Sequence, residues 1–116
     1  MLKDQFQVAE GKPRLVEFFA WEGAADKRFK VLLGQAAELF GEITGQEPDA
    51  KGTGILAGVH GAEVSGKDEE GQFTILRLAV IGGETAAISY SGPGPLTDAD
   101  SRTFNTICMT GLEQRK

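Results

Sequence analysis

The only histidine in this sequence, His60, is the first candidate for catalysis or metal binding. His60 stands three residues before Glu63 in a glycine-marked, apolar stretch. Residues three apart on a strand point to opposite faces, so this pair cannot chelate one metal ion unless a bulge rotates one of them. We expect His60 to be a packed or surface residue rather than a catalytic base or metal ligand.

The single cysteine, Cys108, is expected to be structural rather than catalytic. Cys108 falls on the apolar stripe of a predicted C-terminal helix, where a cysteine behaves as a small buried hydrophobe. A nucleophilic thiol needs a base to activate it, and nothing in the sequence brings His60 near. One cysteine also excludes an internal disulfide and any multi-cysteine metal site.

Two further motifs have structural explanations. The glycines of residues 52–58 look like a dinucleotide fingerprint, but such a fingerprint follows a strand and opens a helix, whereas these follow a helix. Asp98 and Asp100 lack the other ligands of a calcium loop, and helix capping accounts for both. We therefore predict no cofactor and no metal, and no catalytic residue is assigned.

The segment Gln72–Ser91 predicts a central β-hairpin, because two apolar runs flank Gly82-Gly83, and glycine supplies the positive φ of a tight turn. Its first arm is apolar on both faces, with Phe73, Ile75, Ala79 and Ile81 on one face and Leu76, Leu78 and Val80 on the other. Such a strand is covered on both sides and belongs in the middle of a sheet.

The rest of the chain supplies the layers around this hairpin. A strand is predicted over 14–21, and a long helix over 27–44, where apolar residues recur at three- and four-residue spacing. Gly34 and Gly41 lie inside that helix, and we expect them to pack closely against the sheet. Residues 52–65 read as one long strand with a glycine bulge, and a second helix follows Thr97 as its N-cap.

The predicted fold is α+β: an antiparallel sheet in the order strand, helix, three-strand meander, helix, with the helices packed on the sheet. A cystatin-like arrangement with an added helix is the alternative. At 116 residues the chain is expected to form a single domain over 1–116, with 1–13 a frayed or edge segment.

Composition limits the function classes. The net charge of −5 argues against a nucleic-acid or anionic-membrane surface, and no apolar run approaches the length of a membrane span. The N-terminal residues contain no signal-peptide core. We expect a soluble protein, either cytoplasmic or the mature form of an exported one.

Residues 59–66, the Gly82-Gly83 hairpin, Tyr90, Gly92-Pro93 and the helix bearing Phe104, Ile107 and Leu112 resemble the PsbP-like family. That family includes the photosystem II extrinsic PsbP proteins, the Ran-binding Mog protein and small bacterial exported proteins. The similarity covers about residues 14–112 and consists of apolar spacings rather than a catalytic signature. It implies an accessory, assembly or binding role.

One departure from the family pattern bears on partners. Family members begin with an extra hairpin, whereas only a short polar segment stands before Pro13 here. A missing hairpin would leave a sheet edge open to a partner or a second copy of the chain.

Three functions follow as hypotheses. The first is a noncatalytic protein-binding or assembly domain, acting through a sheet edge or through surface aromatics such as Trp21 and Tyr90, with a homodimer as one form. The second is an apolar-ligand pocket between the long helix and the sheet, lined by Trp21, Phe29, Phe40 and Tyr90. The third is an enzyme that uses His60 with a nearby carboxylate.

Overall fold

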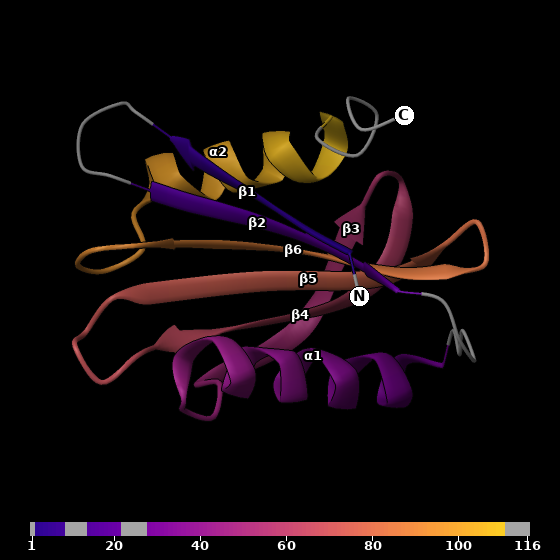
Figure 1. The fold of residues 1–116 in the computed structure, drawn as a ribbon, viewed down its shortest axis with the longest axis horizontal. Coiled ribbons are helices and arrows are strands. Elements are labelled where there is room, and N and C mark those ends of the chain that lie inside the picture. The colour runs from indigo at the N-terminus through magenta and orange to yellow at the C-terminus, as the bar shows by residue number, and fades with distance from the viewer. Residues whose placement is uncertain (1, 9–13, 22–27, 111–116) are drawn as a thin grey trace.

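The computed structural model describes residues 2–8, 14–21 and 28–110. Six strands and two helices are found in these ranges, which gives the expected α+β fold (Figure 1). The elements in chain order are β1 (Leu2–Val8), β2 (Arg14–Trp21), α1 (Phe29–Thr44), β3 (Ala50–Leu56), β4 (Val59–Lys67), β5 (Phe73–Ile81), β6 (Glu84–Gly92) and α2 (Asp98–Thr110).

All described strands join one antiparallel sheet in the order β1-β2-β6-β5-β4-β3. The predicted hairpin is its centre: β5 and β6 are joined by Gly82 and Gly83, whose φ values of 60° and 84° match a two-residue turn of the I′ type. Strand β1 is the terminal strand of the sheet, beside β2, and residues 1 and 9–13 of the expected frayed or edge segment lie outside the described ranges.

The two helices cover opposite faces of this sheet, α1 on one side and α2 on the other (Figure 1). The alternation predicted for β5 is confirmed, because its two sets of apolar side chains enter two separate core clusters. Leu76, Leu78 and Val80 pack with α1, and Phe73, Ile75 and Ala79 belong to the cluster that contains Phe104 and Cys108 of α2. Alternation therefore makes β5 the shared wall of two cores.

The long helix is confirmed, but the reason given for its glycines is wrong. No atom of a neighbouring element lies within 4 Å of a Cβ built on Gly34, and on Gly41 the nearest is the Gln46 carbonyl at 3.8 Å. These glycines therefore lie away from the sheet, and the buried side of α1 consists of Leu32, Ala36, Leu39 and Phe40. The helix ends at Gly45, whose φ of 75° is the left-handed value typical of a C-terminal glycine.

The single strand predicted over 52–65 is wrong. The chain reverses at Ala57 and Gly58, with φ values of 51° and 80°, so that β3 and β4 form a hairpin. These angles match a type I′ turn, and the meander consequently contains four strands rather than three. Alanine is sterically disfavoured in the left-handed region, so Ala57-Gly58 differs from the glycine and asparagine pairs that usually predict such a turn.

The predicted start of α2 is confirmed by its capping bonds. The Asp100 backbone N–H donates to Thr97 Oγ1 at 3.1 Å, and the Asp100 carboxylate accepts from the Thr97 N–H and hydroxyl. This reciprocal arrangement is a capping box with aspartate in place of glutamate. The inward stripe is also confirmed, since Phe104 and Cys108 are fully buried and Ile107 packs against them; residues 111 and 112 lie outside the described ranges.

Candidate functional site

Of the four aromatic residues expected to line one pocket, the side chains of three are described, and the sheet separates two of these. Phe40 is fully buried in the cluster under α1, whereas Tyr90 is buried in the cluster on the opposite face of the sheet. Phe29 lies at the start of α1 and is 44% exposed, and the Trp21 side chain falls outside the described part of the chain. The sheet separates Phe40 from Tyr90, so no common pocket contains both.

Tyr90 is a structural residue rather than a surface anchor. Its hydroxyl donates to Asp100 Oδ1 at 2.8 Å, and its ring lies 5.6 Å from that of Phe73 and 6.0 Å from that of Phe104. A buried tyrosine needs a partner for its hydroxyl, and Asp100 supplies one at the first turn of α2. Tyr90 thereby joins β6 to α2.

His60 is exposed on β4, opposite Ile55 of β3. Glu63 lies on the other face, as expected, where it pairs with Arg77. Across the described residues, no three histidine, cysteine, aspartate or glutamate side chains are grouped to hold a metal ion. The site geometry therefore gives His60 no carboxylate partner among the groups described here.

Arg77 is the organising side chain of the α2-facing surface, and sequence reasoning did not single it out. Its Nε donates to Glu63 Oε1 at 2.6 Å, its Nη1 to the Ile55 carbonyl at 3.1 Å, and its Nη2 to Asn105 Oδ1 at 2.6 Å. The guanidinium carbon also lies 4.9 Å from the centre of the Phe104 ring. One side chain on β5 therefore ties together β3, β4 and α2.

A glycine in the edge strand makes room for this arginine. A Cβ built on Gly54 would lie 2.6 Å from Arg77 Nε and 2.8 Å from its Cδ, far inside normal contact. Gly54 thus lets the arginine cross β3 and reach the carbonyl of Ile55. Gly54 of β3 therefore serves the close approach of a side chain, which is one of the roles of strand glycine.

Cys108 lies beside the guanidinium and is inert. It is fully buried, and burial raises the pKa of its thiol from 9.0 to about 12, although the nearby Arg77 charge opposes that rise. The thiol is therefore protonated at neutral pH and a poor nucleophile. The expectation of a small buried hydrophobe is confirmed.

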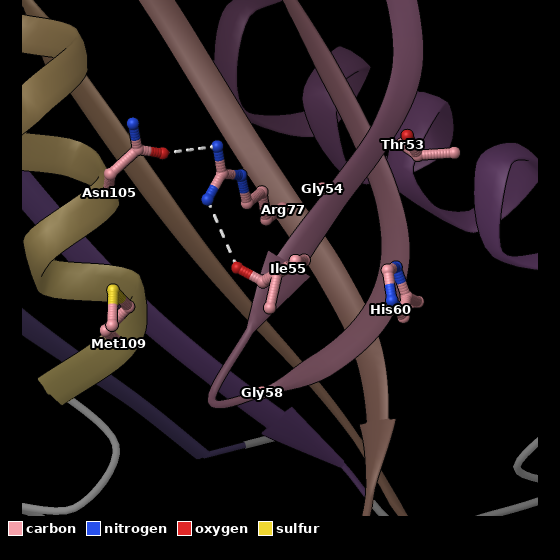
Figure 2. A pocket seen from close by; sticks show the side chains of 8 residues that line it. All are labelled: Thr53, Gly54, Ile55, Gly58, His60, Arg77, Asn105 and Met109. Carbon is pink, nitrogen blue, oxygen red and sulfur yellow. Dashed lines mark hydrogen bonds between the residues drawn. The ribbon is translucent and has the colours of Figure 1, made fainter.

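An open hollow of about 600 Å³ borders Arg77 where β3 approaches α2 (Figure 2). Its β3 lining is Thr53, Gly54 and Ile55. Asn105 and Met109 of α2 lie on one side of β3 in Figure 2, and His60 of β4 lies on the other. The hollow therefore wraps around a strand at the border of the sheet.

Two exposed apolar side chains, Ile55 and Met109, are part of the lining of this hollow. Ile55 is 45% exposed and Met109 is 64% exposed, which is high for side chains of this size. Arg77 and Asn105 add hydrogen-bond donors at one end. Apolar surface with a few oriented polar groups is typical of a binding site.

The border strand β3 also offers its backbone. In a two-residue hairpin the residues next to the turn, Leu56 and Val59, bond each other, so alternate residues of β3 direct their N–H and C=O away from β4. These outward residues are Lys51, Thr53 and Ile55. The Arg77 bond to the Ile55 carbonyl agrees with this assignment, because that carbonyl is accessible from outside the hairpin.

The local sequence held one signal for this site. Arg77 is the charged residue in a strand otherwise apolar on both faces, and a charge in such a strand requires partners. Its partners Glu63 and Asn105 are 14 and 28 residues away, and only the folded chain brings them together.

A scan against protein-family models matches none of them, and a search of the curated proteins finds no similar sequence. The resemblance to the PsbP-like family accordingly stays a prediction. In the part of the chain that the structure describes, neither helix is long and apolar enough to cross a membrane.

Proposed function

We propose that this chain is a noncatalytic protein-binding domain of the accessory or assembly type, and that it binds an extended segment of its partner along β3. The observation that carries the proposal is the coincidence of outward backbone groups on β3 with the exposed Ile55 and Met109 beside it. Backbone groups of an edge strand supply affinity in strand addition, and adjacent apolar surface supplies specificity.

The resemblance to the PsbP-like family, which implies an accessory, assembly or binding role, also supports a noncatalytic binding domain. The other two hypotheses have less support. Phe40 and Tyr90 occupy different cores, so the ligand pocket between α1 and the sheet lacks its proposed lining. An enzyme based on His60 has no carboxylate placed to assist it among the described groups.

A proline at Thr53 tests strand addition directly. The Thr53 N–H is assigned outward, so Thr53→Pro removes a donor to the partner while the bonds from β3 to β4 stay. The probe is a phage-displayed library of random peptides of about 10 residues, the upper length of a common strand. The library is selected on the wild-type chain, and enriched peptides are then synthesised for affinity measurement.

Enriched peptides should bind Thr53→Pro at least about tenfold more weakly, the loss expected for a hydrogen bond left unmade in an interface. Thr53→Val is the matched control, because it keeps the N–H and the β-branched shape. Equal affinity for wild type and Thr53→Pro, or a selection that enriches no peptide, would refute the proposal. Sedimentation over a concentration series shows whether the wild-type chain self-associates, and loss of that association in Thr53→Pro would place it at the β3 edge.

A further inference from the structure

The lining of the hollow bears on the chemistry of a segment that would bind at β3, and the inference drawn from it rests on the proposed function. The whole chain is acidic, with 17 aspartate and glutamate residues and a net charge of −5. Yet the residues that line the hollow include no aspartate or glutamate, and their one formal positive charge is the Arg77 guanidinium, which is paired with Glu63.

The guanidinium retains donor capacity after its internal bonds. Arginine has five N–H groups, and its bonds to Glu63, Ile55 and Asn105 use one group on each nitrogen. Two N–H groups on the terminal nitrogens remain, and the Arg77 side chain also forms a hydrogen bond with Cys108, which leaves one donor. Glu63 accepts from Nε, so this remaining donor lies on one of the terminal nitrogens, which bond Ile55 on β3 and Asn105 on α2.

Asn105 adds donors at the same end. Its Oδ1 accepts from Arg77, which leaves its Nδ2 directed away from the guanidinium, as Figure 2 shows. Asn105 is exposed, and within the described ranges its Nδ2 has no hydrogen-bond acceptor. A group that accepts from both the Asn105 amide and the Arg77 guanidinium would complete this corner of the hollow.

We infer that the segment bound at β3 presents a carboxylate to Arg77 and Asn105 while its apolar residues contact Ile55 and Met109. A carboxylate has two acceptor oxygens and accepts from a guanidinium with favourable geometry. The Ile55 carbonyl is already bonded by Arg77, so an incoming strand would meet Arg77 at this point in the ladder. The carboxylate comes from an acidic side chain or from the C-terminus of the segment.

The test uses the same peptide selection with two charge variants. Asn105→Asp keeps the oxygen that Arg77 needs but adds a negative charge inside the hollow. Thr106→Asp adds the same charge at the next position of α2, on an exposed residue outside the lining. Enriched peptides are synthesised with each acidic residue replaced by its amide and with the C-terminus free or amidated.

The expected result is an acidic residue at a constant position among the enriched peptides, or a required free C-terminus. Asn105→Asp should then weaken binding about tenfold, and Thr106→Asp less than about twofold, since an exposed charge is largely screened. This inference would be overturned if peptides that need the Thr53 N–H showed no preference for a carboxylate. It would also be overturned if Asn105→Asp and Thr106→Asp weakened binding equally. Either result would leave the proposal of strand addition intact. Failure to enrich any Thr53→Pro-sensitive peptide would overturn both.

Discussion

Arg77 shows how one residue can organise a surface that its own neighbours do not suggest. It stands on the α2-facing side of β5 among Phe73, Ile75 and Ala79, and all the hydrogen bonds found for its side chain within the described ranges reach other elements. Its side chain is only 15% exposed, so those bonds replace water that the fold has removed. The position of the guanidinium therefore depends on its hydrogen-bond partners, and Arg77 in turn forms part of the lining of the hollow.

The space provided by Gly54 can be tested with alanine. In Gly54→Ala the new Cβ would lie 2.6 Å from Arg77 Nε, so the side chain must leave the position that bonds Ile55. We expect the free energy of unfolding in urea to fall by about 1–3 kcal/mol. Gly52→Ala is the matched control, because nothing lies within 4 Å of its Cβ. Equal stability of the two variants would contradict the role given to Gly54.

The buried thiol predicts a pH dependence. The pKa of Cys108 is raised from 9.0 to about 12 by burial, so between these values the unfolded chain loses the thiol proton while the folded chain keeps it. Stability from this group is complete below pH 9 and is lost as pH rises toward 12, by up to about 1.4 kcal/mol per pH unit.

Comparison with Cys108→Ala isolates the contribution of the thiol to the pH dependence of stability. Urea unfolding of the wild-type chain should lose stability more steeply above pH 9 than unfolding of the variant does, because other titrating groups act on both. Parallel curves for the two proteins would show that the thiol ionises as readily in the fold as out of it.

At the scale of elements, α2 is attached to the sheet by polar bonds as well as by its apolar stripe. Asp100 accepts from the Thr97 backbone and hydroxyl and from the Tyr90 hydroxyl, and it is 5% exposed. At the other end of the helix, the Ala57 N–H donates to the Cys108 carbonyl at 2.9 Å. These bonds set where α2 lies and hence where Asn105 meets Arg77.

Removing the Asp100 carboxylate should loosen this attachment. Asp100→Ala leaves the buried Tyr90 hydroxyl without this acceptor and ends the capping box, and we expect thermal and urea unfolding to show a loss of about 1–3 kcal/mol. Asp98→Ala removes an exposed charge from the same turn and should cost less than about 1 kcal/mol. Similar losses in both variants would mean that only the helix dipole is involved.

At the scale of the whole molecule, two cores share one sheet. Strands β5 and β6 contribute side chains to the cluster under α1 and to the cluster that contains Phe104. Because the two clusters share these strands, neither should unfold while the other remains. The fold is therefore expected to unfold as one cooperative unit.

Two core phenylalanines test that cooperativity. Phe40→Ala and Phe104→Ala each empty a fully buried site, one in each cluster, and each should cost about 3–5 kcal/mol. Amide NMR signals of α1 and α2 should disappear at the same urea concentration in either variant. Phe29→Ala, at an exposed position, is the control and should leave the midpoint nearly unchanged. Separate midpoints for the two helices would contradict a shared core.

Local patterns were enough to predict the central hairpin, β2, α1 and α2. Gly82-Gly83 allows the positive φ values of a two-residue turn, and the side-chain period assigned each apolar residue of β5 to its correct face. Thr97 and Asp100 marked the start of α2 through bonds between residues three apart. These features depend on short-range sterics and periodicity, which a sequence displays directly.

The β3–β4 turn and the hollow needed the tertiary structure. Ala57 adopts a left-handed conformation that is unfavourable for alanine, and its backbone N–H donates to the Cys108 carbonyl of α2. The residues next to Ala57 in the sequence therefore did not predict the turn. Arg77, Glu63 and Asn105 meet only because the sheet order and the position of α2 bring distant segments together. The sequence by itself determined which residues avoid water and where most elements begin. Which polar side chains face one another was decided by packing between elements, since that arrangement minimises a free energy summed over the whole chain.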